Sequence, residues 1–366
     1  MTVEYRNGGG SAYFAASNSR RGFASYYESC FRHRVDHLIC IKGGPGTGKS
    51  TLMRRVAMEA ERRGWQAEYY YCSSDADSLD AVLLYGKGQS LGLLDATLPH
   101  AFEPGLPGVE EEILDLGQFW NASQLSERRG EILALNRHKA QGYRKAYRYL
   151  AGVGEVSDVL RETVTPALEE GRLTKTVNRL LRECPKGDGK AEMGVGLSDS
   201  IGMRGRVRLD TYLSLGERVC LIEDYYDSAY HMMRLLCDEA FARGMRMRVS
   251  YHPILADEVD ALYLPDGKTV FFVCAAEDVE ACRTRAPHAR LIAMRRLVRR
   301  EAFAAVRGQV RYASKLCEGL LGGAEEALAE VSRAHDELEH LYGAAMDFAA
   351  VERFTKELCQ KWFDGE

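Results

Sequence analysis

The stretch that decides the fold is GGPGTGKST, which runs from Gly43 to Thr51. It follows the apolar run LICI at residues 38–41 and precedes a segment with helical periodicity. A strand, a glycine-rich loop and a helix in this order are the context that a phosphate-binding loop requires, and the GxxxxGKS spacing is complete. We therefore expect this chain to bind a nucleoside triphosphate.

Each residue type in this loop has a physical reason to be there. Glycines let successive backbone N–H groups point inward at an anion, and the N-terminus of the following helix adds its dipole. Lys49 is expected to reach the β- and γ-phosphates, the Ser50 hydroxyl to ligate Mg²⁺, and Thr51 to lie near the α-phosphate. The predicted ATP-binding residues are Gly43, Gly44, Pro45, Gly46, Thr47, Gly48, Lys49, Ser50 and Thr51.

Length and composition describe the rest of the chain in outline. A chain of 366 residues with 46% hydrophobic and 28% charged residues is long enough for two domains with their own cores. The net charge of −4 gives no strong nucleic-acid signal and no attraction to an anionic membrane. No apolar run approaches membrane-spanning length, and nothing at the N-terminus has the form of a signal peptide.

The cysteines point to a reducing compartment. None of the ten cysteines is spaced as CxxC, and most lie inside apolar strand or helix patterns. Reduced cysteines in a core fit this pattern best, so we expect a cytoplasmic protein.

A second residue expected at the magnesium site is an aspartate that follows the loop in the sequence. Residues 90–95 read SLGLLD, an apolar strand pattern closed by Asp95, which has the form of a Walker B strand. Asp95 is therefore predicted to act with Ser50 on Mg²⁺ and, with Lys49, in catalysis. The alternative is that Asp95 only ends a buried strand.

The second half of the sequence repeats the first. Two long helical patterns, expected at 123–150 and 155–183, lead to a linker at 185–190, PKGDGK. A shift of 180 positions then aligns residues 38–84 with 218–264 without a gap and with thirteen identities. Among the identical pairs are Cys40 and Cys220, Gly64 and Gly244, Asp77 and Asp257, and Asp80 and Asp260. A fixed register over this length indicates an internal duplication.

The second copy has lost the loop. Gly43, Gly48, Lys49 and Ser50 correspond to Glu223, Ser228, Ala229 and Tyr230. This position therefore lacks the glycines, the lysine and the magnesium hydroxyl, and Glu223 with Asp224 would repel a triphosphate. We expect the second half to keep the fold without binding nucleotide.

These motifs also support a resemblance. The segments ICIKGGPGTGKSTLMRRV, YYYCSSDADSLDAV and LGLLDATLPH resemble an uncharacterised bacterial family of tandem P-loop ATPase-like proteins. The resemblance covers most of the chain and implies a duplicated architecture with nucleotide binding and presumed hydrolysis. Some members have a second copy that resembles a working loop, and this chain departs from them.

More than one residue is a candidate for the group that activates the nucleophile. Many ATPases place a glutamate directly after the Walker B aspartate, but here that residue is Ala96. Asp75 and Asp77 follow the expected strand at 67–72 and suit either a catalytic base or a helix cap. Because Asp77 recurs in the second copy, Asp75 is the stronger catalytic candidate.

Other side chains with a possible role are a histidine and three arginines. His100 suits a phosphate contact, a catalytic base, or a surface or packing position. Arg20, Arg21 and Arg204 suit either an arginine finger or a surface position.

The sequence thus predicts two tandem P-loop NTPase-type α/β domains, 1–186 and 187–366, each a mostly parallel sheet flanked by helices with a helical extension, the second copy degenerate. The expected function is Mg²⁺-dependent ATP binding and hydrolysis by the first domain, with the second as a regulatory or scaffolding domain. The alternatives are a small-molecule or nucleotide kinase and an ATP-gated switch that acts on an unknown protein partner. If the strand that ends in Asp95 lies next to the strand before the loop, the arrangement favours the kinase hypothesis. A strand between these two would favour the ATPase hypothesis.

Overall fold

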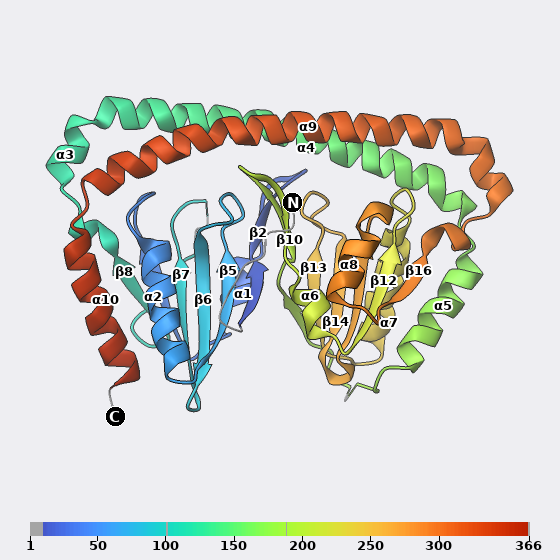
Figure 1. Cartoon of the computed structure of the whole chain (residues 1–366), viewed down its shortest axis with the longest axis horizontal. Helices are drawn as coiled ribbons and strands as arrows, with labels where there is room; N and C mark the ends of the chain where they lie inside the picture. Colours follow the sequence, from blue (N-terminus) through green and yellow to red (C-terminus); the bar gives the residue numbers. More distant parts are fainter. Residues whose placement is uncertain (1–9, 100–101, 188, 365–366) are drawn as a thin grey trace.

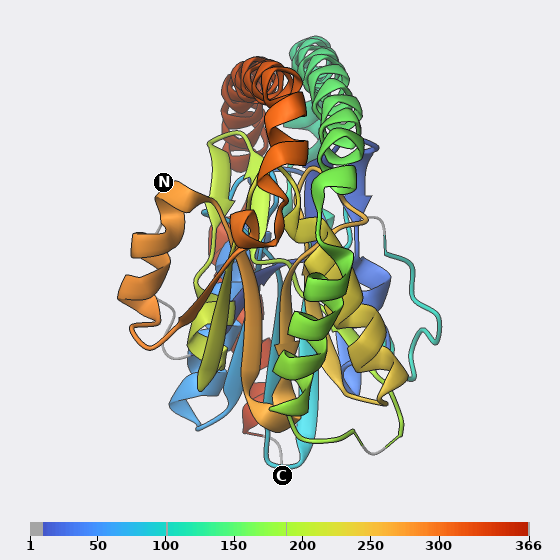
Figure 2. The ribbon, with the colours of Figure 1, turned by 90° about the vertical axis from the view of Figure 1, so that its right-hand side faces the viewer.

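Two α/β lobes lie side by side, and two long helices run across both of them (Figure 1). The computed structural model describes residues 10–99, 102–187 and 189–364. Seen end-on, the long helices form a separate layer above the sheets and their flanking helices (Figure 2). Two six-stranded sheets and helices on their faces make this an α/β protein, as the sequence predicts.

The first sheet has the strand order β1-β5-β6-β7-β4-β8. Its strands are β1 (Ser11–Phe14), β4 (His37–Lys42), β5 (Gln66–Tyr71), β6 (Leu79–Gly86), β7 (Gln89–Asp95) and β8 (Glu111–Asp115). β6 is antiparallel to both of its neighbours, and every other pair is parallel. β4, the strand before the Gly43–Thr51 loop, lies between β7 and β8, and Ile41 is in register with Asp95.

The second sheet repeats this order. Its strands are β9 (Met193–Val195), β12 (Arg218–Glu223), β13 (Met247–Tyr251), β14 (Val259–Leu264), β15 (Thr269–Cys274) and β16 (Arg290–Ala293). They are arranged as β16-β12-β15-β14-β13-β9, so that β12 takes the place of β4 and β14, again antiparallel, takes the place of β6. This correspondence supports the internal duplication.

Short helices flank each sheet, and their patterns explain why they pack there. The first lobe contains α1 (Tyr27–Phe31) and α2 (Lys49–Arg62), and the second contains α6 (Thr211–Leu215), α7 (Ala229–Ala242) and α8 (Val279–Arg285). The short helix α3 (Ala122–Glu127) buries no residue and lies instead at the start of the long helix α4 (Arg129–Val164). α2 buries Leu52, Val56 and Ala60, which recur at helical spacing, and packs against β5 and β6. α7 packs against β14 in the equivalent way.

The helix expected at 123–150 does not stop there. α4 (Arg129–Val164) continues through residues 151–154, so the predicted break near Gly152 and Gly154 is wrong. Both glycines serve close packing instead, because an added Cβ would lie 3.3 Å from Leu320 at Gly152 and 2.5 Å from Arg20 at Gly154. The helix ends only before Pro166, in a short 3₁₀ turn.

The long helices carry each half of the chain onto the other lobe. α4 packs along α9 (Arg300–Ala344) over most of its length. α4 leads to α5 (Glu170–Arg182), which packs on α7 of the second lobe, while α9 leads to α10 (Phe348–Phe363), which packs on α2 of the first (Figure 1). The expected domain boundary at 186 stays a prediction, but each side of it supplies a helix to the other lobe.

Two small hairpins are exchanged in the same reciprocal way. They are β2 (Ala16–Ser19) with β3 (Gly22–Ser25) and β10 (Asp199–Gly202) with β11 (Gly205–Arg208). Phe14, which ends β1, and Leu197, which precedes β10, form two backbone hydrogen bonds, because the N–H of each donates to the carbonyl of the other at 2.8 Å. Arg21 forms an ion pair with Asp257 of the second lobe, and Arg204 forms the matching pair with Asp77 of the first. The lobes are therefore related by an approximate two-fold axis near Phe14.

A buried ion pair also joins the lobes. Arg248 of β13 donates to the two carboxylate oxygens of Glu68 at 2.9 and 3.2 Å and to the Tyr70 hydroxyl at 2.8 Å. Its guanidinium carbon also lies 3.8 Å from the centre of the Tyr13 ring. Burial alone would raise the pKa of Glu68, but Arg248 and Arg34 hold it below its ordinary value.

Two further observations concern the environment of the chain. Within the described ranges, no helix combines the length and the apolar character that crossing a membrane demands. All ten cysteines are free, and seven of them are buried. The expected cytoplasmic location stays a prediction.

Candidate functional site

The Gly43–Thr51 loop leaves the carboxyl end of β4 and enters α2 at Lys49. Gly46 and Gly48 have φ angles of +65° and +89°, a backbone conformation that glycine adopts without a steric penalty. Thr47 is buried, and its hydroxyl donates to the carbonyl of Gly44 at 2.9 Å, which closes the loop on itself. The loop therefore has the tight turn and the exposed helix N-terminus that an anion site needs.

Lys49 lies folded over this loop. Its Nζ donates to the carbonyls of Gly43 and Gly44 at 3.1 and 2.7 Å and lies 3.5 Å from a carboxylate oxygen of Asp95. The side chains of Lys49 and Asp95 are only 12% and 13% exposed. Two of the predicted catalytic residues are thus brought together at the end of β4 and β7.

Ser50 is hydrogen-bonded to the start of β6, next to an acidic residue outside the predicted set, while its joint action with Asp95 on Mg²⁺ stays a prediction. Its hydroxyl accepts a hydrogen bond from the backbone N–H of Leu79 at 2.9 Å, at the start of β6. The next residue, Asp80, is 3% exposed. Like Lys49 and Ser50, it lines a large cavity that lies above the loop. Because β6 runs antiparallel, its first residues lie at the edge where the parallel strands end. Asp80 is therefore a second metal-site candidate that the sequence indicated only as a match to Asp260.

Asp75 lies at the rim of the cavity, where it caps a turn. Its carboxylate accepts from the Ser78 hydroxyl at 2.9 Å, and its backbone carbonyl accepts from the Ser78 N–H at 2.9 Å. Arg204 approaches it at 3.6 Å and forms a closer ion pair with Asp77. These contacts supply the capping role considered from the sequence. A catalytic role for Asp75 stays a prediction.

Of the three candidate arginines, only Arg204 contacts the acidic loop beside this cavity. Arg20 pairs with Asp158 of α4, and Arg21 pairs with Asp257. Arg204 comes from the second half of the sequence, so the rim of the site is built by both halves. His100 lies outside the described residues.

The cavity above the loop is large and has a roof made of the long helices. Its volume is about 1040 Å³, and it reaches from Pro45 and Lys49 to α4 and α9. The residues that the roof contributes are Asn136, Lys139, Ala140, Tyr143, Arg144 and Tyr147 from α4 and His335 and Glu339 from α9. The periodicity of these helices gave no signal for this role, because it shows which positions share a face and not which surface that face covers.

α9 touches the loop backbone directly. An added Cβ on Gly46 would lie 2.3 Å from the carbonyl oxygen of Glu339, and one on Gly44 would lie 2.8 Å from the ring of Tyr342. The Gly46 backbone also contributes, after His335, to lowering the pKa of the Glu339 carboxyl group. The glycines at these two positions therefore allow the helix, as well as a ligand, to approach closely.

In the second lobe, side chains fill the equivalent place. The Asp224 carboxylate accepts from the backbone N–H groups of Asp227 and Ala229 at 2.8 Å, at the N-terminus of α7. Arg161 of α4 pairs with Asp227 and Glu258 and lies 4.2 Å above the ring of Tyr230. Burial raises the pKa of the Asp227 and Glu258 carboxyl groups. The chain thus supplies its own charges where the first lobe has an open cavity.

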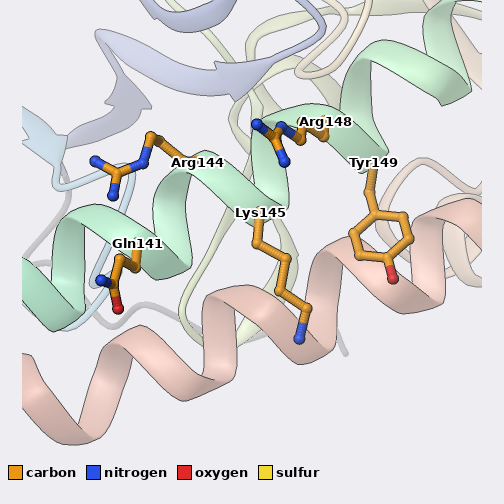
Figure 3. Close-up of a pocket in the computed structure, with 5 residues that line it drawn as sticks. All are labelled: Gln141, Arg144, Lys145, Arg148 and Tyr149. Carbon is orange, nitrogen blue, oxygen red and sulfur yellow. The ribbon is translucent and has the colours of Figure 1, made fainter.

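A separate hollow lies on α4. It has a volume of about 470 Å³ and is lined by Gln141, Arg144, Lys145, Arg148 and Tyr149 (Figure 3). Lys145 and Tyr149 point towards α9, while Arg144 and Arg148 point away from it (Figure 3). Arg144 also lines the larger cavity, so the two hollows meet at this side chain.

The comparisons with known proteins add one short match. Residues 24–84 match the family model described as Nephrocystin 3, N-terminal. This segment contains β4, the glycine-rich loop, α2, β5 and most of β6. Neither the curated proteins nor the solved structures contain a match to this chain. The resemblance to a bacterial tandem family stays a prediction.

Proposed function

We propose that the first lobe binds Mg·ATP on the Gly43–Thr51 loop and hydrolyses it. The observation that carries the proposal is the position of Lys49, held over the loop carbonyls and 3.5 Å from Asp95 at the floor of a large cavity. A lysine and a helix N-terminus at one point favour the binding of a phosphate group. Glu339 supports the same view, because His335 and, to a smaller extent, the Gly46 backbone and Lys49 lower the pKa of its carboxyl group, as expected beside a loop that favours negative charge.

The residues fit a magnesium ion as well as a triphosphate. Ser50 at the first turn of α2 offers the hydroxyl ligand, and Asp80 and Asp95 lie at the same cavity. Mg²⁺ bound there would neutralise charge on the phosphates during transfer. The protein residues have the remaining tasks: the loop amides and Lys49 orient the phosphates, and the roof helices exclude water from them.

Phosphoryl transfer to a small acceptor is a second candidate, favoured by three observations. β7, which ends in Asp95, is the direct neighbour of β4, and this adjacency is the arrangement expected for the kinase class. The residue after Asp95 is the buried Ala96, which offers no group to activate water. A cavity of about 1040 Å³ also lies at the upper end of the usual range for ligand sites and leaves space for an acceptor.

Phosphate release from ATP by the full chain tests the proposal. We expect release with Mg²⁺ that is lost in Lys49→Ala and retained in Arg62→Ala, an exposed cation at the far end of α2. Release that appears only when a metabolite mixture is added would favour the kinase. Unchanged ATP affinity and turnover in Lys49→Ala would refute both candidates, and tight binding without turnover under any condition would favour the switch.

A further inference from the structure

Three side chains of the long helices form a connected series that ends on the glycine-rich loop. Lys139 of α4 has its Nζ 3.1 Å from Nδ1 of His335 on α9. The Nε2 of His335 lies 3.5 Å from a carboxylate oxygen of Glu339, one turn further along α9. The backbone of Glu339 lies against Gly46, where an added Cβ would be 2.3 Å from the Glu339 carbonyl oxygen. All three side chains line the cavity that contains Lys49.

Glu339 lies where an anionic ligand is expected. Backbone N–H groups at a glycine-rich turn before a helix attract negative charge, and Glu339 of the same chain lies against this turn at Gly46. The hydrogen bond from His335, with further contributions from the Gly46 N–H and from Lys49, holds the pKa of Glu339 below its ordinary value. An ionised carboxylate therefore lies beside the loop, close to His335 and Lys49.

Lys139 is a partly buried cation that faces the same cavity. Burial, with a smaller contribution from the charge of Lys49, lowers its pKa. Within the described part of the chain, no carboxylate lies within ion-pair distance of Lys139, and its hydrogen-bonding neighbour is His335. A charge in this position is costly unless an anion compensates it, so a phosphate in the cavity would be favoured by Lys139 as well as by Lys49.

We propose that Lys139 and His335 form a second phosphate-binding group, supplied by the roof helices, and that Glu339 is an internal anion which a bound triphosphate displaces. This inference rests on the proposed function and extends it, since the loop, α4 and α9 together would hold the phosphates. Lys139 belongs to the first half of the sequence and His335 to the second. The site is complete only when both long helices lie over the loop.

Calorimetric titration of the full chain with ATP and with inorganic tripolyphosphate, both with Mg²⁺, tests this. Glu339→Gln removes the competing charge, so we expect about tenfold tighter binding of both ligands. Lys139→Met removes a phosphate contact, so we expect about tenfold weaker binding of both. The matched controls are Glu337→Gln and Lys145→Met, exposed residues on the same two helices, which should stay within about twofold of wild type.

The outcomes separate this inference from the proposed function. A gain of affinity in Glu339→Gln cannot arise from misfolding, so it supports the inference even if Lys139→Met is unstable. If both variants bind as wild type does while Lys49→Ala abolishes binding, the inference is overturned and the proposed function stands. If neither wild type nor Glu339→Gln binds ATP or tripolyphosphate, both are overturned.

Discussion

Replacing Gly46 by alanine tests whether α9 closes on the loop in the way described. Gly46 has a φ of +65°, and an added Cβ would lie 2.3 Å from the carbonyl oxygen and 2.8 Å from the Cα of Glu339, both backbone atoms of a 45-residue helix. An alanine at positive φ costs about 1 kcal/mol. The overlap with α9 adds about 1–3 kcal/mol, because the helix must shift and lose packing. We expect the free energy of unfolding to fall by about 2–4 kcal/mol.

Gly64→Ala is the matched control. Gly64 ends α2 with a φ of +82°, but an added Cβ there would meet no atom within 4 Å. We therefore expect this variant to lose only the backbone part, about 1 kcal/mol. Guanidinium denaturation followed by tryptophan fluorescence measures both losses. If the two variants lose the same free energy within about 0.5 kcal/mol, α9 does not contact the loop as closely as the structure has it.

Three further predictions concern the interface, the core and the pH response. Arg248→Ala should lower the free energy of unfolding by about 3–5 kcal/mol, because Glu68 stays buried without its partner. The double variant Arg248→Met with Glu68→Leu should recover most of this loss in the same denaturation assay. Leu328→Ala, in the fully buried seam of α4 and α9, should cost about 2–5 kcal/mol, and a loss no larger than that of the half-exposed Leu316→Ala would contradict this packing. Burial, aided by the charge of Arg206, lowers the pKa of His252 to about 3. Since the unfolded chain takes up this proton below about pH 6.5 and the folded chain does not, the contribution of His252 to the free energy of unfolding should fall by about 1.4 kcal/mol per pH unit between pH 6.5 and pH 4.5. Asp227 and Glu258, whose pKa values are raised, change stability in the opposite direction, so this contribution is measured as the difference between urea titrations of wild type and His252→Asn.

The sequence predicts the parts of the fold that depend on local pattern. The strand before Gly43, the helix that starts at Lys49 and the strand that ends in Asp95 all lie where spacing and apolar runs indicate. The repeat at a shift of 180 positions also predicts two sheets of one design, since a fixed register over strands and helices requires it. Lys49 and Asp95 meet because both follow neighbouring strands at one edge of the sheet.

The roof of the site could not be predicted in this way. The apolar stripe of α9 identifies a packing face, but it does not say that Glu339 lies on Gly46, almost 300 positions away along the chain. Asp80 was hidden for another reason, because an antiparallel strand brings its first residues, rather than its last, to the functional edge. The sequence also predicts two helices with a break at 151–154, although Gly152 and Gly154 are contact points inside one continuous helix.

The exchange of α5 and α10 also bears on how such a chain arises. Each half of the sequence lends its last helix to the other half, and Phe14 with Leu197 marks the axis between them. This is the geometry of a two-fold symmetric dimer with swapped terminal helices. Here the two halves form a single polypeptide, because the segment between Glu183 and Met193 connects them covalently. A protease cut in that connection should therefore leave two interlocked fragments that elute together.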